Sequence, residues 1–332
     1  MTCIAINGMG RTGRLMLRDF LTGRAPAGLT LAAVNDIADP DDIAYLTTYD
    51  SVHGRLPEPV RLEGEHLVFQ DQRIRVLQQR DPSHLPWGEL GVDVVIESTG
   101  QFTGRDEAAA HLQAGAGRVL IGAPSEDADL TMVLGVNEGD YDPDRHRIVS
   151  NASCTTNSLA PVLKILDDAF GLEAVLANTV HAYTATQGLV DKPARKKHRG
   201  RAAAVSMIPT STGADRATVR VLPRLDGKLS AAAIRVPVPD GSVTDINARL
   251  SQPATAEAVN GALRDAATGR LAGVLGYTEE ELVSVDILGR RESGIVHAGA
   301  TASVGDLAKV LVWYDNEAGY AARCLDVAAR VL

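Results

Sequence analysis

The 332-residue chain is predicted to be an α/β protein whose first half forms a doubly wound parallel sheet with helices on both faces. Short apolar runs recur through residues 1–152 and alternate with stretches of helical periodicity. One of these runs leads directly into a glycine-rich loop. The length is a third indication, because a chain of this size exceeds one typical core and favours two domains.

The first predicted strand, at residues 3–6, is followed by Gly8-Met9-Gly10-Arg11-Thr12-Gly13 and then by apolar residues at helical spacing. A strand, a glycine loop and a helix start in this order let the backbone approach a pyrophosphate closely, with the helix N-terminus facing its charge. The G-x-G-x-x-G pattern alone is weak, because glycine turns are common. Our hypothesis is a Rossmann-type domain in which Gly8 and Gly10 contact a dinucleotide.

A second predicted strand, at residues 29–34, ends in Asn35-Asp36. An acid at this point can hold the ribose hydroxyls of adenosine, and its charge repels the extra phosphate of NADP. Asp36 therefore favours NAD as the cofactor. The alternative is that Asp36 is an ordinary turn residue at a strand end.

Three further apolar runs, at 92–97, 118–121 and 131–134, are predicted to be buried strands, with a helix around 107–114. The loops Ser98-Thr99-Gly100 and Ala123-Pro124-Ser125 follow two of these strands. Loops at strand C-termini are expected to line the cofactor crevice, although they could be plain connections.

The segment Ser150-Asn151-Ala152-Ser153-Cys154-Thr155-Thr156-Asn157 places a thiol where a helix is predicted to begin. Asn151 or Ser153 is the expected N-cap, and Pro161 is expected to start or bend the helix. The positive end of a helix favours the thiolate, so Cys154 is a candidate nucleophile. The alternative is a small buried cysteine used only for packing.

A strand predicted at 175–184 carries His181, the candidate base and acid for Cys154. A lone histidine in a strand is more often structural, and the pairing with a candidate nucleophile favours the catalytic interpretation. The other histidines lack such a setting. No His-Glu-x-x-His motif or cysteine cluster indicates a metal site.

Hydroxyls and flexible backbone in Pro209-Thr210-Ser211-Thr212-Gly213, and the guanidinium of Arg235 on a predicted strand, suit an anion such as phosphate. The basic run at 195–201 could be a solvated loop, a positive rim that attracts a phosphorylated substrate, or a nucleic-acid contact. The last option is the weakest, because the chain carries a net charge of −9.

The composition is 45% hydrophobic and 23% charged, which is typical of a soluble α/β protein. The acidic balance argues against nucleic acid or an anionic membrane as a partner. No secretory signal or apolar run long enough to span a bilayer is found, and three scattered cysteines are too few for a disulfide scaffold. A cytoplasmic location is expected.

With these elements in place, the chain resembles the phosphorylating, NAD-dependent glyceraldehyde-3-phosphate dehydrogenases over nearly its whole length. The motifs that carry the resemblance are Tyr49-Asp50-Ser51-Val52-His53-Gly54, Glu97-Ser98-Thr99-Gly100, residues 150–157, Thr179-Val180-His181-Ala182-Tyr183-Thr184, Ser211-Thr212-Gly213, Arg235-Val236-Pro237 and Trp313-Tyr314-Asp315-Asn316-Glu317. The resemblance implies an NAD-binding domain at 1–152, an α+β catalytic domain with a mixed or antiparallel sheet at 153–315, a C-terminal helix at 316–332 that returns to the first domain, and a homotetramer.

The resemblance also implies roles for single residues. Cys154 attacks an aldehyde, His181 activates it and takes a proton, and inorganic phosphate cleaves the resulting thioester to an acyl phosphate. Thr184 and Arg235 hold the phosphate of the sugar. The attacking phosphate is held by Ser153, Thr155, Thr212, Gly213 and Arg199, with Arg201 as the other choice for the arginine. The residues that match dinucleotide contacts are Arg11, Thr12, Asp36, Arg80, Ser125 and Asn316.

Some positions depart from the family pattern. Ser158 stands where a second cysteine is frequent, Ala318 stands where a large residue is common, and Lys192 beside Pro193 could soften the preference for NAD. Two alternatives stay open: an erythrose-4-phosphate dehydrogenase, and a specialised isozyme that tolerates a thiol-directed inhibitor.

Overall fold

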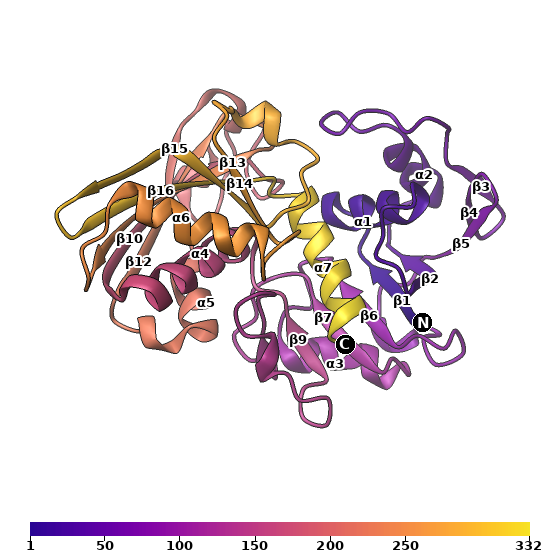
Figure 1. The fold of residues 1–332 in the computed structure, drawn as a ribbon. Coiled ribbons are helices and arrows are strands. Elements are labelled where there is room, and N and C mark those ends of the chain that lie inside the picture. The colour runs from indigo at the N-terminus through magenta and orange to yellow at the C-terminus, as the bar shows by residue number, and fades with distance from the viewer. The chain divides into compact units, whose positions relative to one another are not determined.

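The computed structural model describes all residues from Met1 to Leu332, and the chain forms two compact units (Figure 1). The first unit comprises Met1–Met132, Glu138–Ala152 and Ala321–Leu332, and the second comprises Val133–Asn137 and Ser153–Tyr320. The first unit is therefore built from three separate stretches of chain. The C-terminal segment of the first unit begins at residue 321. The boundary expected from the sequence was residue 316, five residues earlier.

The first unit is built on a nine-stranded sheet of order β3-β4-β5-β2-β1-β6-β7-β9-β8. Its strands are β1 (Thr2–Asn7), β2 (Leu29–Asn35), β3 (Arg61–Glu63), β4 (His66–Phe69), β5 (Gln72–Leu77), β6 (Val94–Glu97), β7 (Arg118–Ile121), β8 (Leu130–Thr131) and β9 (Ile148–Ser150). All pairs from β5 to β8 along this order are parallel, and β3-β4-β5 is an antiparallel edge. The predicted parallel sheet is confirmed.

The helices of this unit are α1 (Arg11–Leu21), α2 (Pro40–Thr48) and α3 (Arg105–Gln113), with short 3-10 turns η1 (Pro82–His84) and η2 (Glu138–Asp140). Helices α1 and α3 lie on opposite sides of the sheet in Figure 1. The chain passes from β1 to β2 on one side and later to β6 on the other side of β1. The carboxyl ends of β1 and β6 therefore form the switch point at which open α/β sheets bind their ligands.

One predicted strand, 131–134, is wrong beyond Thr131. The backbone N–H of Val133 donates to Oδ1 of Asn137 at 2.9 Å, and the N–H of Val136 donates to the carbonyl of Val133. These bonds close a turn, so the apolar residues after Thr131 are buried without belonging to a strand.

The second unit contains a seven-stranded mixed sheet of order β11-β12-β10-β13-β16-β15-β14. Its strands are β10 (Leu172–Ala182), β11 (Ile208–Ser211), β12 (Leu229–Val236), β13 (Ser242–Leu250), β14 (Leu275–Thr278), β15 (Gly294–Val304) and β16 (Leu307–Tyr314). Only the β10–β12 and β14–β15 pairs are parallel. The expected mixed sheet is confirmed.

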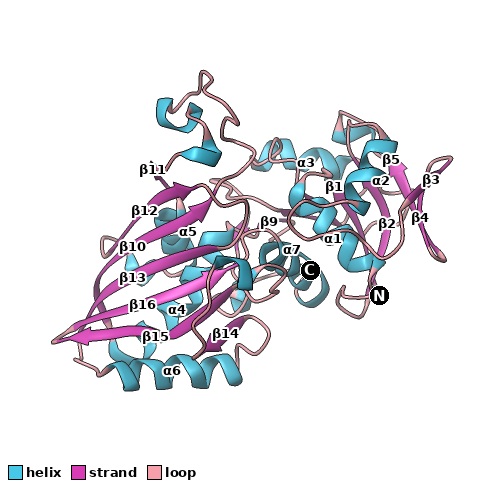
Figure 2. Cartoon of the chain, turned by 90° about the horizontal axis from the view of Figure 1, so that it is seen from above, coloured by secondary structure: helices cyan, strands magenta, loops and turns pink.

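Three helices, α4 (Cys154–Phe170), α5 (Ala214–Val221) and α6 (Ala256–Thr268), pack on this sheet, and Figure 2 shows them along one face of it. Short 3-10 turns are η3 (Lys197–Gly200), η4 (Ala203–Val205), η5 (Pro223–Leu225) and η6 (Ser284–Ile287). On β13 the buried residues alternate with half-buried or exposed ones, as expected when a strand is covered on one face. The last helix, α7 (Ala318–Arg330), begins in the second unit and continues into the first.

Candidate functional site

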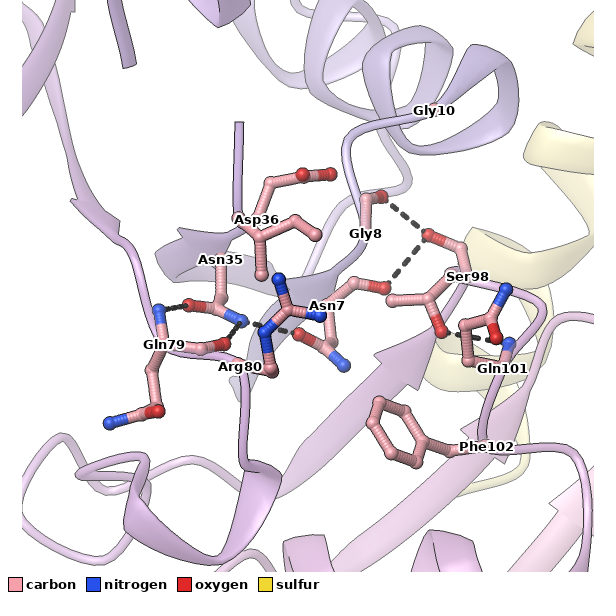
Figure 3. Close-up of a pocket in the computed structure, with 12 residues that line it drawn as sticks. Asn7, Gly8, Gly10, Asn35, Asp36, Gln79, Arg80, Ser98, Gln101 and Phe102 are labelled. Carbon is pink, nitrogen blue, oxygen red and sulfur yellow. Dashed lines mark hydrogen bonds between the residues drawn. The ribbon is translucent and has the colours of Figure 1, made fainter. Parts of the chain in front are cut away.

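A pocket in the first unit lies at the carboxyl ends of β1, β2 and β6 (Figure 3). It is lined by Asn7, Gly8, Gly10, Asn35, Asp36, Ile37, Gln79, Arg80, Ser98, Thr99, Gln101 and Phe102. The glycine loop and the Ser98-Thr99 loop are joined here, because the hydroxyl of Ser98 donates to the carbonyl oxygens of Gly8 at 2.7 Å and Asn7 at 3.1 Å. The pocket therefore occupies the predicted dinucleotide crevice.

At two positions in the loop only glycine fits, because neighbouring backbone atoms lie too close for a Cβ. Gly8 has φ +100°, and a Cβ on it would lie 2.5 Å from the backbone nitrogen of Thr99. A Cβ on Gly13 would lie 2.0 Å from the carbonyl oxygen of Gly8. Gly10, the N-cap of α1, has φ −67° and open space beside it. The backbone at Gly10 is thus exposed for contact with a ligand, while Gly8 and Gly13 hold the loop against its neighbours.

Asp36 and Arg80 both line the pocket. The Asp36 carboxylate accepts the N–H groups of Met9 at 2.6 Å and Ala38 at 2.9 Å, so it connects the end of β2 to the glycine loop. Two backbone donors fix this carboxylate beside the place where an adenosine ribose would lie.

Other residues that match dinucleotide contacts do not line this pocket. Arg11 forms a two-pronged ion pair with Asp50, and the bonds from Arg11, His53 and Val52 outweigh burial and lower the pKa of Asp50 to about 2. The buried Ser125 accepts the N–H of Ala128 and donates to Asp127. Thr12 is half-buried in the first turn of α1.

Sequence reasoning missed a buried polar network beneath the pocket. The indole N–H of Trp87 donates to Nδ1 of His111 at 3.0 Å, so the other ring nitrogen, Nε2, carries the proton and donates to Glu97 at 3.1 Å. Glu97 also accepts from the Asn7 side chain and from the backbone and hydroxyl of Thr99. Four donors surround one buried carboxylate, which fixes the side chain of Asn7 and the loop at Thr99, both of which line the pocket.

In the second unit, Cys154 is the first residue of α4, and Ser153 is its N-cap. The Ser153 hydroxyl accepts the N–H of Thr156 at 3.1 Å, as expected for a cap. The predicted helix start is confirmed with Ser153 as the cap. Pro161 does not start the helix, because α4 runs without interruption from Cys154 to Phe170 and includes it. Ser158 is buried and donates to the carbonyl of Thr155, and all three cysteines are free.

His181 lies on β10 with its Nε2 atom 3.5 Å from the sulfur of Cys154. Its Nδ1 atom lies 2.7 Å from the carbonyl oxygen of Ala182, which can only accept a hydrogen bond. Nη1 of Arg235 also lies 3.1 Å from Nδ1, but it donates to the same carbonyl of Ala182 at 2.9 Å. We therefore place the proton on Nδ1, so that Nε2 offers its lone pair to the thiol. The ring is also held from one side, because the ring of Tyr314 meets it edge to face at 5.9 Å. This tautomer is the one that a general base requires.

The charges around this pair act in opposite directions. Burial raises the pKa of the Cys154 thiol, and the positive charge of Arg235 and the bonds from Thr155 lower it only in part. Burial, and to a smaller extent the charge of Arg235, lower the pKa of His181 to about 3. Both shifts favour a neutral thiol and a neutral imidazole over an ion pair. The thiolate expected from the helix start stays a prediction.

Arg235 lies beside His181 because β12 and β10 are parallel neighbours in which these two residues are paired. Its Nη1 atom donates to the carbonyl of Ala182 at 2.9 Å and lies 3.4 Å from the hydroxyl of Thr184. A guanidinium and a hydroxyl thus meet within reach of the thiol–imidazole pair. This arrangement can bind an anionic group such as phosphate.

Arg199 and Arg201 differ in their surroundings. Arg199 donates to the hydroxyl of Thr210 at 3.0 Å and to the carbonyl of Ser211, and its charge lowers the pKa values of His181 and Arg235. Arg201 is instead paired with Asp191 at 2.9 Å, and both side chains are largely exposed. The structure therefore brings Arg199, and not Arg201, into the electrostatic field of the candidate site.

The remaining predicted phosphate ligands occupy helix starts or buried positions. Thr212 and Gly213 directly precede α5, and the Thr212 hydroxyl accepts the N–H of Ala214. Thr155 is buried, and its hydroxyl lies 3.0 Å from that of Tyr314.

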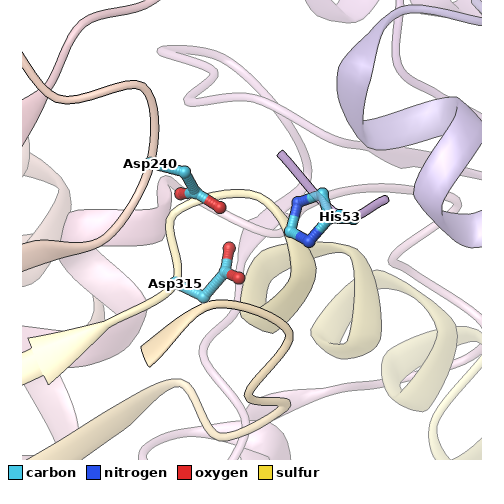
Figure 4. Close-up of side chains that lie close together, drawn as sticks. All are labelled: His53, Asp240 and Asp315. Carbon is cyan, nitrogen blue, oxygen red and sulfur yellow. The ribbon is translucent and has the colours of Figure 1, made fainter. Parts of the chain in front are cut away.

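Asp240 and Asp315 turn their carboxyl groups toward each other (Figure 4). Asp315 accepts three backbone N–H groups, from Gly289, Glu317 and Ala318. Burial and the charge of Asp315 raise the pKa of Asp240 to about 9, so Asp240 is protonated at neutral pH. The next residue, Asn316, accepts a hydrogen bond from the hydroxyl of Ser242 at 2.5 Å.

No helix in the structure combines the length and the apolar character needed to cross a membrane. The first unit has a switch-point crevice with a glycine loop and an acid at the end of β2. The second has a thiol, an imidazole oriented as a base, and a guanidinium beside them. These features define the class of NAD-binding dehydrogenases that work through a cysteine.

Comparison with known proteins identifies the family. Residues 2–105 match the family model for the NAD binding domain of glyceraldehyde 3-phosphate dehydrogenase, and residues 153–316 match the model for its C-terminal domain. The glyceraldehyde-3-phosphate dehydrogenase of Kitasatospora aureofaciens is 52% identical over 326 residues, which is 98% of each chain. That of Geobacillus stearothermophilus is 48% identical over 329 residues, 99% of this chain and 97% of the relative. The chain belongs to the glyceraldehyde-3-phosphate dehydrogenase family.

Proposed function

We propose that the chain oxidises D-glyceraldehyde 3-phosphate with NAD and inorganic phosphate and forms 1,3-bisphosphoglycerate. The observation that carries this proposal is the thiol–imidazole pair of Cys154 and His181 with Arg235 and Thr184 beside it. Family membership supports the same reaction. The named relatives are all glyceraldehyde-3-phosphate dehydrogenases, so the alternative substrate erythrose 4-phosphate is not favoured.

In the first step the thiol of Cys154 adds to the aldehyde carbon. The S–H proton passes to Nε2 of His181, which faces the sulfur, and then to the carbonyl oxygen, so a neutral hemithioacetal forms. The Nδ1–H bond to Ala182 keeps the ring in the tautomer that can do this. Arg235 and Thr184 hold the phosphate of the sugar and thereby bring its aldehyde to the sulfur.

In the second step the hemithioacetal loses a hydride and a proton, and a thioester on Cys154 remains. NAD, when bound, supplies the hydride acceptor. His181 takes the hydroxyl proton through the same Nε2 atom. An oxygen of inorganic phosphate then forms a bond to the thioester carbon, and the C–S bond breaks. The proton of the phosphate passes to the leaving sulfur, so that the thiol of Cys154 is restored. In our proposal this phosphate is held by Arg199, Thr212, Gly213, Ser153 and Thr155.

The residues that hold NAD in this proposal are Gly8, Gly10, Arg11, Thr12, Asp36, Arg80 and Ser125 from the first unit and Asn316 from the second. The observation that supports the fit is the close packing at Gly8, which leaves the loop backbone open at Gly10. The Asp36 carboxylate supports NAD over NADP. Lys192 is exposed, and only its backbone N–H forms a bond, to Gly200. We retain the preference for NAD.

We further propose that the protein acts in the cytoplasm as a homotetramer, with 1–152, 153–315 and 316–332 as its functional parts. The face of the second sheet opposite α4, α5 and α6 supports an assembly. Ile234, Val180, Val243 and Trp313 form one row across four neighbouring strands, and each is only half-buried. A row of half-exposed apolar side chains on a wide sheet suits a second copy of the chain.

Steady-state formation of NADH tests the function. Glyceraldehyde 3-phosphate and erythrose 4-phosphate are compared with NAD and NADP, each with and without inorganic phosphate. We expect the highest kcat/KM for glyceraldehyde 3-phosphate with NAD and a requirement for phosphate. Phosphate-independent oxidation of erythrose 4-phosphate at the higher efficiency would overturn the proposal. Repeating the assay with a thiol-directed inhibitor tests the specialised-isozyme alternative.

A further inference from the structure

Ser242, the first residue of β13, is 1% exposed and lies between groups from two other parts of the second unit. Its hydroxyl oxygen accepts the backbone N–H of Ala182 at 3.1 Å. The same hydroxyl donates to Oδ1 of Asn316 at 2.5 Å. Ala182 follows the candidate base His181, so this hydroxyl joins the end of β10 to the residue proposed to meet the nicotinamide.

The bonds at Ser242 give the Asn316 amide an orientation. The backbone N–H of Ala182 can only donate, so the Ser242 oxygen accepts it and keeps its own proton to donate. That proton goes to the carbonyl oxygen Oδ1 of Asn316. The Asn316 side chain forms no other hydrogen bond, and its Nδ2 atom is not among the buried polar atoms. Both N–H groups of Asn316 are left for an incoming acceptor.

The surroundings of Ser242 are rigid. Gly241, immediately before it, has φ +85°, and a Cβ there would lie 2.4 Å from the carbonyl oxygen of Ser284. Asp315, immediately before Asn316, is held by three backbone N–H groups and by the protonated Asp240. The two neighbours of Gly241 thus hold two consecutive residues after β16: Asp240 holds Asp315, and Ser242 holds Asn316. Neither end of the Ser242–Asn316 bond can shift readily.

We propose that Ser242 is a positioning residue for the nicotinamide ring. By fixing the amide of Asn316 with Oδ1 inward, it directs Nδ2 to donate to the carbonyl oxygen of the nicotinamide carboxamide. This inference rests on the proposed function, in which Asn316 contacts that carboxamide. Without the hydroxyl, the Asn316 amide loses its one fixed acceptor contact and can turn over, so that an oxygen faces the carboxamide oxygen of the cofactor.

The test compares Ser242→Ala, Asn316→Ala and the double variant in the full-length enzyme, with NAD as the varied substrate. We expect Ser242→Ala to lower kcat/KM for NAD about tenfold, as for loss of a buried hydrogen bond. If Ser242 acts through Asn316, the double variant should match Asn316→Ala within about twofold. Additive losses would overturn the proposal. If Asn316→Ala leaves kinetics with NAD unchanged, the role of Asn316 in the proposed function fails instead.

The 3-acetylpyridine analogue of NAD tests the direction of the bond. It keeps the ring carbonyl oxygen but lacks the amide N–H groups. If Nδ2 donates to the ring carbonyl, the Asn316 oxygen makes no contact with the cofactor, so any difference in binding between NAD and the analogue should not depend on that oxygen. Ser242→Ala should then weaken the binding of NAD and of the analogue alike. If the enzyme's preference for NAD over the analogue disappears in Asn316→Ala but not in Ser242→Ala, the opposite amide orientation holds and the proposal is wrong.

A structural role for Ser242 would have other signs. Alkylation of Cys154 by iodoacetamide in the absence of nucleotide reports on the thiol–imidazole pair alone, and we expect Ser242→Ala to leave its rate unchanged. Ser242→Thr keeps the hydroxyl and should restore most of the kcat/KM for NAD. Slower alkylation in Ser242→Ala, or no recovery in a Ser242→Thr variant that melts at the temperature of the unaltered enzyme, would overturn the proposal.

Discussion

Arg235 shifts the pKa values of both Cys154 and His181, and the two shifts have opposite effects on a thiolate–imidazolium ion pair. Its positive charge lowers the pKa of Cys154, which favours the thiolate, and it also lowers the pKa of His181, which disfavours the imidazolium. The two effects oppose each other, so the charge of Arg235 changes the balance between the neutral pair and the ion pair little. Burial, the largest cause of both pKa shifts, is what disfavours the ion pair.

Replacing His181 by Asn should lower kcat by about 10²- to 10⁴-fold, the usual contribution of a general acid–base group. The reason is that Nε2 is the atom that faces the sulfur of Cys154. The measurement is pre-steady-state formation of NADH, which reports the acylation step. Cys154→Ser is the matched control and should abolish the burst. A full burst in the His181→Asn variant would contradict the assignment.

Replacing Asp36 by Ser should narrow the preference for NAD over NADP, because it removes the charge that repels the additional phosphate. We expect a change of about tenfold in the ratio of the two kcat/KM values, which corresponds to about 1.4 kcal/mol. Asp36 also holds the N–H of Met9, so absolute activity with NAD should fall as well. A ratio that stays the same, or equal use of both cofactors by the unaltered enzyme, would count against the assignment.

At the residue scale, the sequence indicated Cys154, His181 and Arg235, because each stands in an informative local motif. It did not indicate the roles of His111 or Trp87. Their bond joins α3 to a loop 24 residues away in sequence and exists only once the sheet has formed. A histidine in an ordinary helix gives no local signal of such a partner. The same holds for Ser242, whose two partners come from β10 and from the end of β16.

At the element scale, the glycines around the start of α1 have two different roles: one allows close packing, and the other leaves the backbone open to a ligand. A Cβ on Gly13 would meet the carbonyl oxygen of Gly8 at 2.0 Å, whereas a Cβ on Gly10 meets nothing. Gly13→Ala should therefore destabilise the protein by about 1–3 kcal/mol, the usual cost of overpacking. Gly10→Ala should leave stability unchanged and weaken NAD binding, because its backbone faces the ligand. Denaturant unfolding and NAD titration measure both effects, and equal stability of the two variants would contradict the model of the loop.

The turn that joins β12 to β13 predicts a dependence of stability on pH. The pKa of Asp240 is raised from 3.8 to about 9 in the folded chain, next to Asp315 and near Glu317. Between these values the folded state holds a proton that the unfolded state has released, so its stabilising effect is complete below about pH 4 and is lost as pH rises toward 9.

Asp240→Asn should flatten this dependence, because the amide can donate to Asp315 without titrating. The free energy of unfolding should then be higher than that of the unaltered protein at pH 8, and the two should converge toward pH 5. Denaturant titrations from pH 5 to pH 9 measure the effect. An unchanged slope in the variant would show that another group governs it.

Elements with a strong local pattern could be predicted from the sequence, and others could not. The buried strands β1, β2 and β7 are continuous apolar runs, and α4 begins at its cap. The run at 131–134 looked like a strand because it is apolar. However, the backbone N–H of Val133 donates to the side chain of Asn137 and not to a neighbouring strand. In β13, inward Thr244, Ile246, Ala248 and Leu250 alternate with polar residues, a signal that is present in the sequence but weak beside the apolar runs.

At the scale of the whole molecule, the proposed homotetramer leads to a prediction about the second sheet. Val243 lies between Val180 and Trp313 on the face away from α4, α5 and α6. Val243→Asp would place a charge in the centre of an apolar contact between copies and should dissociate the assembly. Sedimentation velocity measures the mass, and Thr268→Asp, at the exposed end of α6, is the control. A Val243→Asp variant that sediments as the unaltered protein would contradict this interface.

The division of the chain between its two units has a consequence for biosynthesis. Residues 321–332 belong to the first unit, and Asn151 donates to the sulfur of Cys324 within it. This last stretch is part of the protein interior, because four of its apolar residues are at most 1% exposed: Ala321, Ala322, Leu325 and Val327. On the ribosome, the domain that is translated first is therefore the one that is completed last. The nucleotide-binding unit cannot complete its packing until α7 has been synthesised and released.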